Sequence, residues 1–586
     1  MKRRIYSIWI LVLIVLIQSS CSDDLLTPKP LSFFAPENVF DKKSGFEASL
    51  VTMRRVLNEG VTGSRRYYMV GEWAASEAGT PTFQTDWTQT TPFFDKYYTF
   101  LGLFTDSYVN IKNANVVIGR IDGITWENEA ERNRILAEAY WHRAYWYYWL
   151  VNSYGDVPFV GEEVQGVKLD YYTHSRWTIL NKIQSDLEFA AEWLPETAVP
   201  GAITRGAANH LLTKVYLANL EFDKAISTAD KLINGPYELM TQRFGASANY
   251  PNRDLIWDLH RPENKNISQN KETILAIVDR FEAPPGAQSA GLYTMRHYNP
   301  SWWHQKVKDS QGQAGMVPSG PMYDSLGRGN PDLMITSYAS YDIWNTNGTT
   351  WRNTTDKRRS DRNWIDKHEI KYNNPASVDF GKPVNTQFIA NRQDSVQLIF
   401  PIAFYKTYAP QQSPTAQPYG GNGDWYIFRL AETYLLRAEA YYWKDQLVNA
   451  AADINKVRER AGALPVSPAD VTIDYIFDER ARELFIEAPR HAEMVRVSYI
   501  LAKSNKLGYS LANFSQKNWW YDRVIALNEI YTLKPLIDGN TPRVEPYHVL
   551  WPIDNNVITA NTLGTINQNA GYAGVEKNKA PLEVIE

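Results

Sequence analysis

Apolar residues recur every three or four positions along several stretches of this chain, which is the period of an α-helix that buries one face. Residues 46–57, 111–121 and 179–194 show this pattern clearly. In the last of them, Ile183 and Leu187 fall on the same side of the helical wheel. The sequence therefore predicts an amphipathic helix in each of these three stretches.

The stretch 137–151 has a different pattern, because apolar or aromatic residues fall on every side of its helical wheel. Seven of these residues are Trp or Tyr. An aromatic ligand site is one interpretation, but a core helix on which other helices pack fits the all-round pattern better. Gly155 then provides a left-handed C-terminal cap, and Pro158 prevents the helix from continuing. Glu138 and Arg143, inside this helix, would need buried polar partners.

Two pairs of helices have small residues at the positions where they would contact each other. The first pair is 205–218 with 222–233, and the second is 428–440 with 447–458. Each pair predicts an antiparallel helical hairpin of the tetratricopeptide type. About two hundred residues separate the pairs, so we interpret them as an interrupted helical repeat rather than a tandem array.

The fold class that follows is mainly α. Helices are also predicted at 474–486 and 490–500, and short apolar pieces at 273–278 and 398–400 predict small strands. We interpret the irregular segment 241–424 as a cap on the helical scaffold, not as an independent domain. The predicted single domain, 36–586, has scaffold segments at about 36–60, 104–240 and 425–500 and loop-rich segments at about 61–103, 241–424 and 501–586.

Composition and charge exclude several classes of function. The formal net charge is −4, and no basic stripe is present, so we predict no nucleic-acid partner. The sequence contains no His-Glu-x-x-His, Gly-x-Ser-x-Gly or P-loop motif, and its histidines lack the spacing of metal ligands. We therefore predict that the protein is not an enzyme and holds neither a metal nor a cofactor.

The N-terminal residues have the organisation of a secretory signal. Residues 5–17 are apolar but too short to span a membrane. The only cysteine, Cys21, follows in a setting that resembles a bacterial lipoprotein box, in which the signal 1–20 is removed and the cysteine is lipidated. The acidic residues within 22–24 resemble the surface-export signal of Bacteroidetes lipoproteins. We expect a lipidated tether at 21–35 and an outer-membrane location facing the cell exterior.

Motifs spread over most of the chain resemble the SusD/RagB family. They lie at 137–139, 143–144, 154–158, 205–208, 215–217, 429–432, 437–440, 454–462, 479–484, 551–553 and 568–572. Ala488, His491 and Glu493 depart from the family's pattern at framework corners. We interpret most of the matched charged residues as a paired network inside the helix packing. This set comprises Glu138, Arg143, Glu432, Arg437, Glu439, Arg458, Glu479 and Glu483.

The resemblance implies a function in nutrient capture. Family members are surface lipoproteins that deliver ligands to a SusC-like TonB-dependent transporter of the outer membrane. The abundance of Trp in the predicted loops favours a glycan as the ligand, because sugars stack on aromatic faces. Two alternatives stay open: capture of peptides, as in the RagB branch, and a role mainly as a lid for the transporter with little ligand binding of its own.

The resemblance also suggests where the ligand binds, since the family's ligand surface draws on the loop after the first helix and on the irregular insertion. Here these correspond to residues 64–100 and roughly 285–365. Tryptophans would supply stacking, and polar side chains nearby would bind hydroxyl groups. The alternative for each tryptophan is that it packs a loop. The predicted ligand-binding residues are Trp73, Asp86, Trp87, Arg296, Asn299, Trp302, Trp303 and Trp344.

Overall fold

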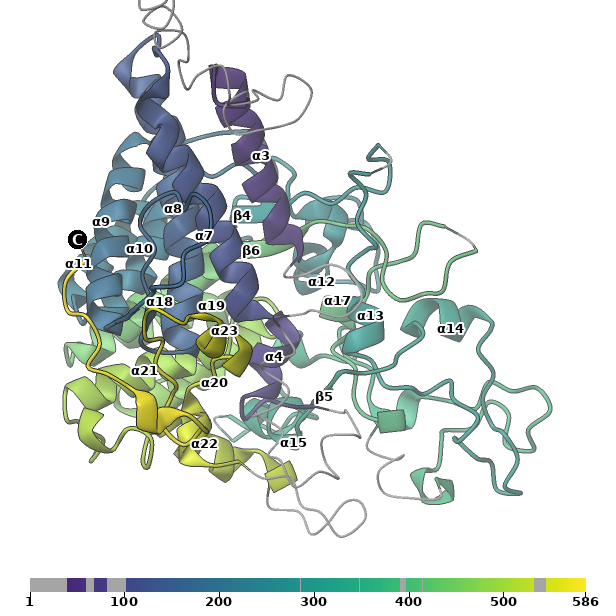
Figure 1. Ribbon diagram of the computed structural model, residues 1–586. Helices are drawn as coiled ribbons and strands as arrows, with labels where there is room; N and C mark the ends of the chain where they lie inside the picture. The colour runs from purple at the N-terminus through teal and green to yellow at the C-terminus, as the bar shows by residue number, and fades with distance from the viewer. Residues whose placement is uncertain are drawn as a thin grey trace, which may run out of the picture.

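The computed structural model describes residues 39–59, 68–81, 102–284, 286–346, 348–389, 397–413, 415–531 and 544–585. The fold is mainly α, as the sequence predicts. Long helices gather on one side of the molecule, and the irregular segment 241–424 lies on the other (Figure 1).

Most helices belong to the scaffold. They are α3 (Lys43–Glu59), α4 (Tyr68–Ala74), α7 (Leu103–Arg120), α8 (Glu129–Ser153), α9 (Arg176–Trp193), α10 (Arg205–Ala218), α11 (Phe222–Ile233), α18 (Leu430–Trp443), α19 (Leu447–Arg460), α20 (Ile473–Leu484) and α21 (His491–Lys503). Two further helices, α22 (Trp519–Leu527) and α23 (Asn555–Ala560), follow in the C-terminal part.

The aromatic helix α8 is the centre of the scaffold, and its prediction as a core helix is confirmed. It packs against α7, α9 and α21, and most of its residues are buried. Gly155 has the left-handed backbone of a C-terminal cap, with φ 71°. The charges inside the helix have partners: Arg143 donates to Asp186 at 2.9 Å, and Glu138 accepts from Nη2 of Arg54 at 2.7 Å.

The two predicted hairpins also form, and they pack together. Helix α10 pairs with α11, and α18 pairs with α19. Helix α11 packs against α18, so the repeat continues in space although the chain between the hairpins is long. Arg437 of α18 reinforces this contact by binding Asp453 of α19 and Asp230 of α11.

The insertion between the hairpins leaves and returns through a pair of antiparallel strands. Strand β4 (Thr273–Ile277) pairs with β6 (Trp425–Arg429), with Thr273 opposite Arg429. The predicted strand at 398–400 is wrong, because its first residue ends a helical turn and the next two are irregular. In the part of the chain that the structure describes, the other strands pair as β1 (Gly79–Pro81) with β5 (Leu333–Ile335), and β2 (Val157–Pro158) with β3 (Thr173–His174).

Short helices carry the rest of the insertion. They are α12 (Leu255–His260), α13 (Thr294–His297), α14 (Pro321–Leu326), α15 (Ser337–Ser340) and α17 (Phe404–Thr407). One hydrophobic cluster joins this segment to the scaffold, since it contains Trp141 of α8, Phe428 of β6 and Trp302 of the insertion. The insertion therefore shares the core of the scaffold.

Candidate functional site

Three segments that are distant in the chain meet around α13 and α14. Arg296 donates its backbone N–H to the carbonyl of Tyr419 at 2.9 Å, and Arg328 donates to the carbonyl of Pro418 at 2.8 Å. Because these contacts join backbone to backbone, they fix where the side chains of the segments start. The segments are 292–303, 326–332 and 418–421.

Two glycines allow the middle segment to approach its neighbours closely. A Cβ on Gly329 would lie 2.1 Å from the carbonyl oxygen of Pro300, and one on Gly327 would lie 2.7 Å from Cβ of Met295. Gly327 also has φ 80°, a conformation that other residues rarely adopt. Arg328, which lies between them, is thereby held against the neighbouring chain.

Two tryptophan side chains hold the segment 326–332 in place by hydrogen bonds to its backbone. Trp302 donates its indole N–H to the carbonyl of Gly327 at 3.0 Å, and Trp303 donates to the carbonyl of Gly329 at 2.7 Å. The two carbonyls flank Arg328 on either side. The position of Arg328 is therefore set by hydrogen bonds that its own side chain does not make.

Four side chains from these segments form a row in which aromatic rings and guanidinium groups alternate. The guanidinium carbon of Arg328 lies 4.6 Å from the ring centroid of Trp303 and 5.8 Å from that of Tyr419. Arg296 lies on the same phenol ring at 4.9 Å. All four side chains are partly exposed. We call Trp303, Arg328, Tyr419 and Arg296 the aromatic–guanidinium row.

Tyr293 lies beside the row, next to Tyr419. Its ring centroid lies 5.3 Å from that of Tyr419. Its backbone is left-handed, with φ 53°, and is held by a hydrogen bond from its N–H to the carbonyl of Gly420 at 3.2 Å. Such strain in a non-glycine residue persists only where the surroundings impose it, and it is often found at ligand sites.

Of the eight ligand-binding residues predicted from the sequence, Arg296 and Trp303 belong to the row. Asn299 and Trp302 lie beneath it, and both side chains are fully buried, with 0% of their surface exposed. Asn299 donates its side-chain amide to the carbonyl of Leu326 at 2.8 Å. In this packing, neither side chain has a surface that a ligand could contact. Both side chains instead hold the backbone beside Arg328.

The structure does not bring Trp73 or Trp344 to the row. Trp73 is 1% exposed; it donates to the carbonyl of Ala488 at 3.1 Å and packs edge-on against Phe485. Trp344 is 3% exposed and packs against Trp364. Both rings pack in the core, so stacking on a ligand would require their surroundings to move. Outside the described residues lie the remaining predicted positions, Asp86, Trp87 and the lipidation residue Cys21.

Sequence reasoning missed Arg328, Tyr419 and Tyr293. A signal for the first exists, since an arginine between two glycines marks a tight approach of the backbone. Tyr419 likewise precedes two glycines, Gly420 and Gly421. Periodicity carries no information on such positions, because turns and not helices place them.

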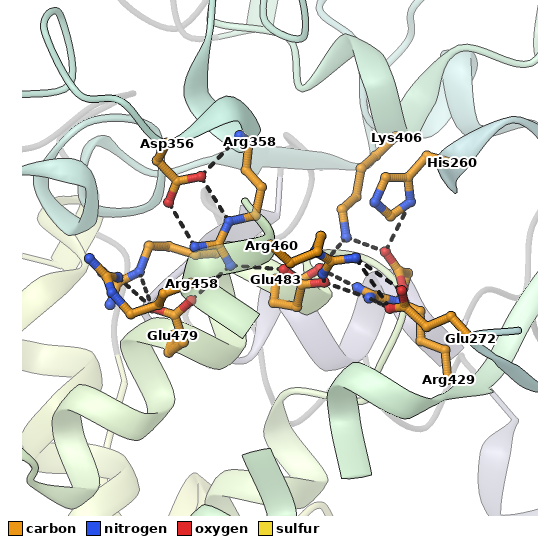
Figure 2. Close-up of polar contacts among 12 residues, drawn as sticks. His260, Glu272, Asp356, Arg358, Lys406, Arg429, Arg458, Arg460, Glu479 and Glu483 are labelled. Atoms are coloured by element: carbon orange, nitrogen blue, oxygen red, sulfur yellow. Dashed lines mark hydrogen bonds and ion pairs between the residues drawn. The ribbon is translucent and has the colours of Figure 1, made fainter. Parts of the chain in front are cut away.

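A second group of charged side chains lies where the insertion joins the scaffold, and it is buried (Figure 2). Glu483 of α20 contacts three guanidinium groups, those of Arg358, Arg429 and Arg460. Glu272, just before β4, contacts two of the same arginines. We call the group the neck network; it comprises His260, Glu272, Asp356, Arg358, Lys406, Arg429, Arg458, Arg460, Glu479, Arg482, Glu483 and Glu487.

The neck network keeps two of its carboxylates, those of Glu479 and Glu483, ionised. Burial by itself would raise the pKa of Glu483, but three arginines and Lys406 hold that pKa well below its ordinary value of 4.5. Burial likewise opposes the ionisation of Glu479, whose pKa is lowered by Arg358 and other arginines. Burial lowers the pKa of Lys406 to about 8, against the opposing effect of Glu487. Carboxylates held in this way are poor general acids or bases.

The sequence predicts a network of paired charges inside the helix packing. This prediction is also confirmed for the predicted residues that lie outside the neck network. Glu432 binds Lys214 at 2.8 Å, and Glu439 binds Arg496 at 2.6 Å. Among the described residues, no group of three or more His, Cys, Asp or Glu side chains is arranged to hold a metal ion.

Sequence profiles of known families match this chain in two places. A profile described as the SusD family matches residues 272–572, which include the aromatic–guanidinium row and all of the neck network except His260. The chain belongs to the SusD family. A second profile, described as "Starch-binding associating with outer membrane", matches residues 53–217 of this SusD family member.

Characterised relatives are distant in sequence. The SusD-like protein P2 of Formosa agariphila is 26% identical over 39% of this chain, a match that spans 46% of P2. The starch-binding protein SusD of Bacteroides thetaiotaomicron is 24% identical over 66% of this chain and 68% of its own length.

A solved structure shows the same fold over nearly the whole chain. A laminarin-binding SusD-like protein superimposes with a TM-score of 0.60 and 19% identity, covering 91% of this chain and all of that one. In the part of the chain that the structure describes, no helix combines the length and apolar character needed to cross a membrane.

Proposed function

We propose that this SusD family member is an outer-membrane surface lipoprotein that binds glycan and passes it to a SusC-like TonB-dependent transporter, without catalysing a reaction. The family match and the predicted lipidation at Cys21 support the location. The carbohydrate ligands named for its relatives, starch and laminarin, support the ligand class.

The observation that carries the proposal is the aromatic–guanidinium row. It places two partly exposed rings, Trp303 and Tyr419, beside two guanidinium groups on a backbone fixed by hydrogen bonds. Aromatic faces bind the C–H faces of sugars, and guanidinium N–H groups bind their hydroxyl oxygens. Rigid backbone lowers the entropy lost when the ligand binds. The row therefore has the groups that a glycan site requires.

Binding is tested with the full mature chain carrying Cys21→Ser, against polysaccharides and peptides, by affinity electrophoresis and calorimetry. We expect retardation by at least one glycan. Trp303→Ala and Tyr419→Ala should each weaken it at least tenfold. Trp351→Ala is the matched control, because Trp351 is a partly exposed tryptophan of the same insertion that packs on Tyr341 outside the row.

The outcomes separate the proposal from its two alternatives. Binding of peptides alone would indicate peptide capture. No binding in isolation, together with stable co-purification with the transporter, would indicate a lid. Lipidation and location are tested separately: Cys21→Ser should release the protein from the membrane fraction, and protease added to intact cells should digest the lipidated form.

A further inference from the structure

The two arginines of the row lack an acidic partner, in contrast to those of the neck network. Among the described residues, the guanidinium of Arg296 makes no ion pair and donates no hydrogen bond, and its Nε atom is buried without a partner. Arg328 makes no ion pair with a described residue and donates to the hydroxyl of Tyr419 at 2.6 Å. Two positive charges therefore lie next to Tyr419, and neither makes an ion pair with a described residue.

Contacts with the neighbouring aromatic side chains determine which N–H groups of these two guanidinium groups are free to bind a ligand. A guanidinium lying on an aromatic face has its plane fixed, while the N–H groups in that plane remain free to donate. Planar carboxylate and sulfate groups accept such paired N–H donors, and the resulting charge-assisted hydrogen bonds are stronger than neutral ones. Arg296 lies 4.9 Å from the ring centroid of Tyr419. Arg328 lies 4.6 Å from the ring centroid of Trp303 and binds the hydroxyl group at the edge of Tyr419.

Among the described residues, Asp324 and Asp332 lie near the row in sequence, and neither forms an ion pair with its arginines. The carboxylate of Asp332 contacts Nδ1 of His297. Asp324 is exposed and makes no ion pair with a described residue. A partly buried cation without a partner is costly, and a ligand anion that pairs with it offsets that cost. The formal net charge of −4 means that attraction for an anion here comes from these local cations, not from the whole protein.

We propose that the glycan bound at the row is acidic, carrying carboxylate or sulfate groups that Arg296 and Arg328 bind directly. This inference rests on the proposed function and adds the chemical class of the ligand. Trp303 and Tyr419 then contact sugar faces, while the arginines contact the charged substituents of the same residue or of its neighbour in the glycan.

The test uses polysaccharides matched in backbone but different in charge, with the mature chain carrying Cys21→Ser. Polygalacturonate is compared with its fully methyl-esterified form, and chondroitin sulfate with desulfated chondroitin; laminarin and amylose are neutral references. We expect at least tenfold tighter binding of a charged polymer than of its less charged or uncharged partner. Preference within the first pair would identify carboxylate as the recognised group, and preference within the second pair would identify sulfate.

Variants show whether the row causes this preference. Arg296→Gln and Arg328→Gln should each weaken binding of the charged polymer at least tenfold, and lysine at either position should restore only part of it, because an ammonium lacks the planar fork. Arg352→Gln is the control, since Arg352 is exposed and stacks on Trp351 at 4.3 Å outside the row. Thermal denaturation establishes that each variant is folded.

The failure of this inference is distinguishable from failure of the proposed function. Binding of neutral glycans that is lost in Trp303→Ala but unchanged in both glutamine variants would overturn the inference and leave glycan binding in place. Equal affinity for the two members of each pair would do the same. Binding of no glycan at all would overturn both.

Discussion

The neck network and the aromatic–guanidinium row both depend on arginine, and they use it in opposite ways. In the network, Arg429 contacts three carboxylates, those of Glu272, Glu483 and Glu487, and is 1% exposed. In the row, Arg328 lies beside Trp303 and the hydroxyl of Tyr419, is partly exposed and pairs with no carboxylate of the described residues. An arginine whose charge is matched inside the fold joins segments, whereas one whose N–H groups remain free at the surface can bind a ligand.

The largest expected effect comes from removing a carboxylate of the network. Glu483→Gln leaves three buried guanidinium groups without one of their partners, so we expect the free energy of unfolding to fall by about 3–5 kcal/mol. Denaturation by urea measures it. The matched change in the row, Arg328→Gln, should alter stability by less than about 0.5 kcal/mol. Equal losses in the two variants would contradict the distinction between the regions.

Lowering the pH should weaken the stabilisation that the neck network provides and leave the contacts of the row unchanged. The folded-state pKa values of Glu479 and Glu483 lie below the ordinary 4.5, so their stabilisation is present above about pH 4.5 and is lost as the pH falls towards those lowered values. Each such carboxylate lowers the free energy of unfolding by about 1.4 kcal/mol per pH unit in that range. Arginine does not titrate there.

Unfolding curves at pH 5, 4 and 3 measure this slope. Glu483→Gln should give a shallower slope than the unmodified protein, because one of the titrating carboxylates is gone. An unchanged slope in that variant would show that other carboxylates account for the acid sensitivity.

The residues of the neck network were easier to predict from the sequence than those of the row, and the reason is physical. The motifs that resemble the family placed Arg458, Glu479 and Glu483 inside helix packing, where burial requires a partner. The row depends on contacts between turns. Arg328 and Tyr419 reach Trp303 only because positive-φ glycines and backbone hydrogen bonds bring distant segments together, and no periodic pattern records that.

The same reasoning explains why most of the predicted tryptophans are not in the row. A tryptophan in an irregular segment can stack on a ligand or fill the core beneath a loop, and composition does not distinguish the two. Trp302 and Trp303 are adjacent in sequence, yet Trp302 is fully buried and Trp303 is partly exposed. Both indole N–H groups bind the chain around Arg328, so the hydrogen bonds do not distinguish the two residues; Trp303 also lies beside the guanidinium of Arg328.

Removing one of these indole N–H donors should therefore weaken glycan binding, although the donor itself does not contact the ligand. Trp302→Phe deletes the hydrogen bond to the carbonyl of Gly327, and we expect about 1 kcal/mol of lost stability from that bond together with a several-fold loss of glycan affinity, because Arg328 is held less firmly. Trp344→Phe is the matched control, since it deletes an indole hydrogen bond of 2.9 Å to the carbonyl of Ala339 away from the row. It should lose similar stability and keep full affinity. If both variants bound glycan equally well, Trp302 would be a core residue only, and the support that we assign to it beneath the row would be wrong.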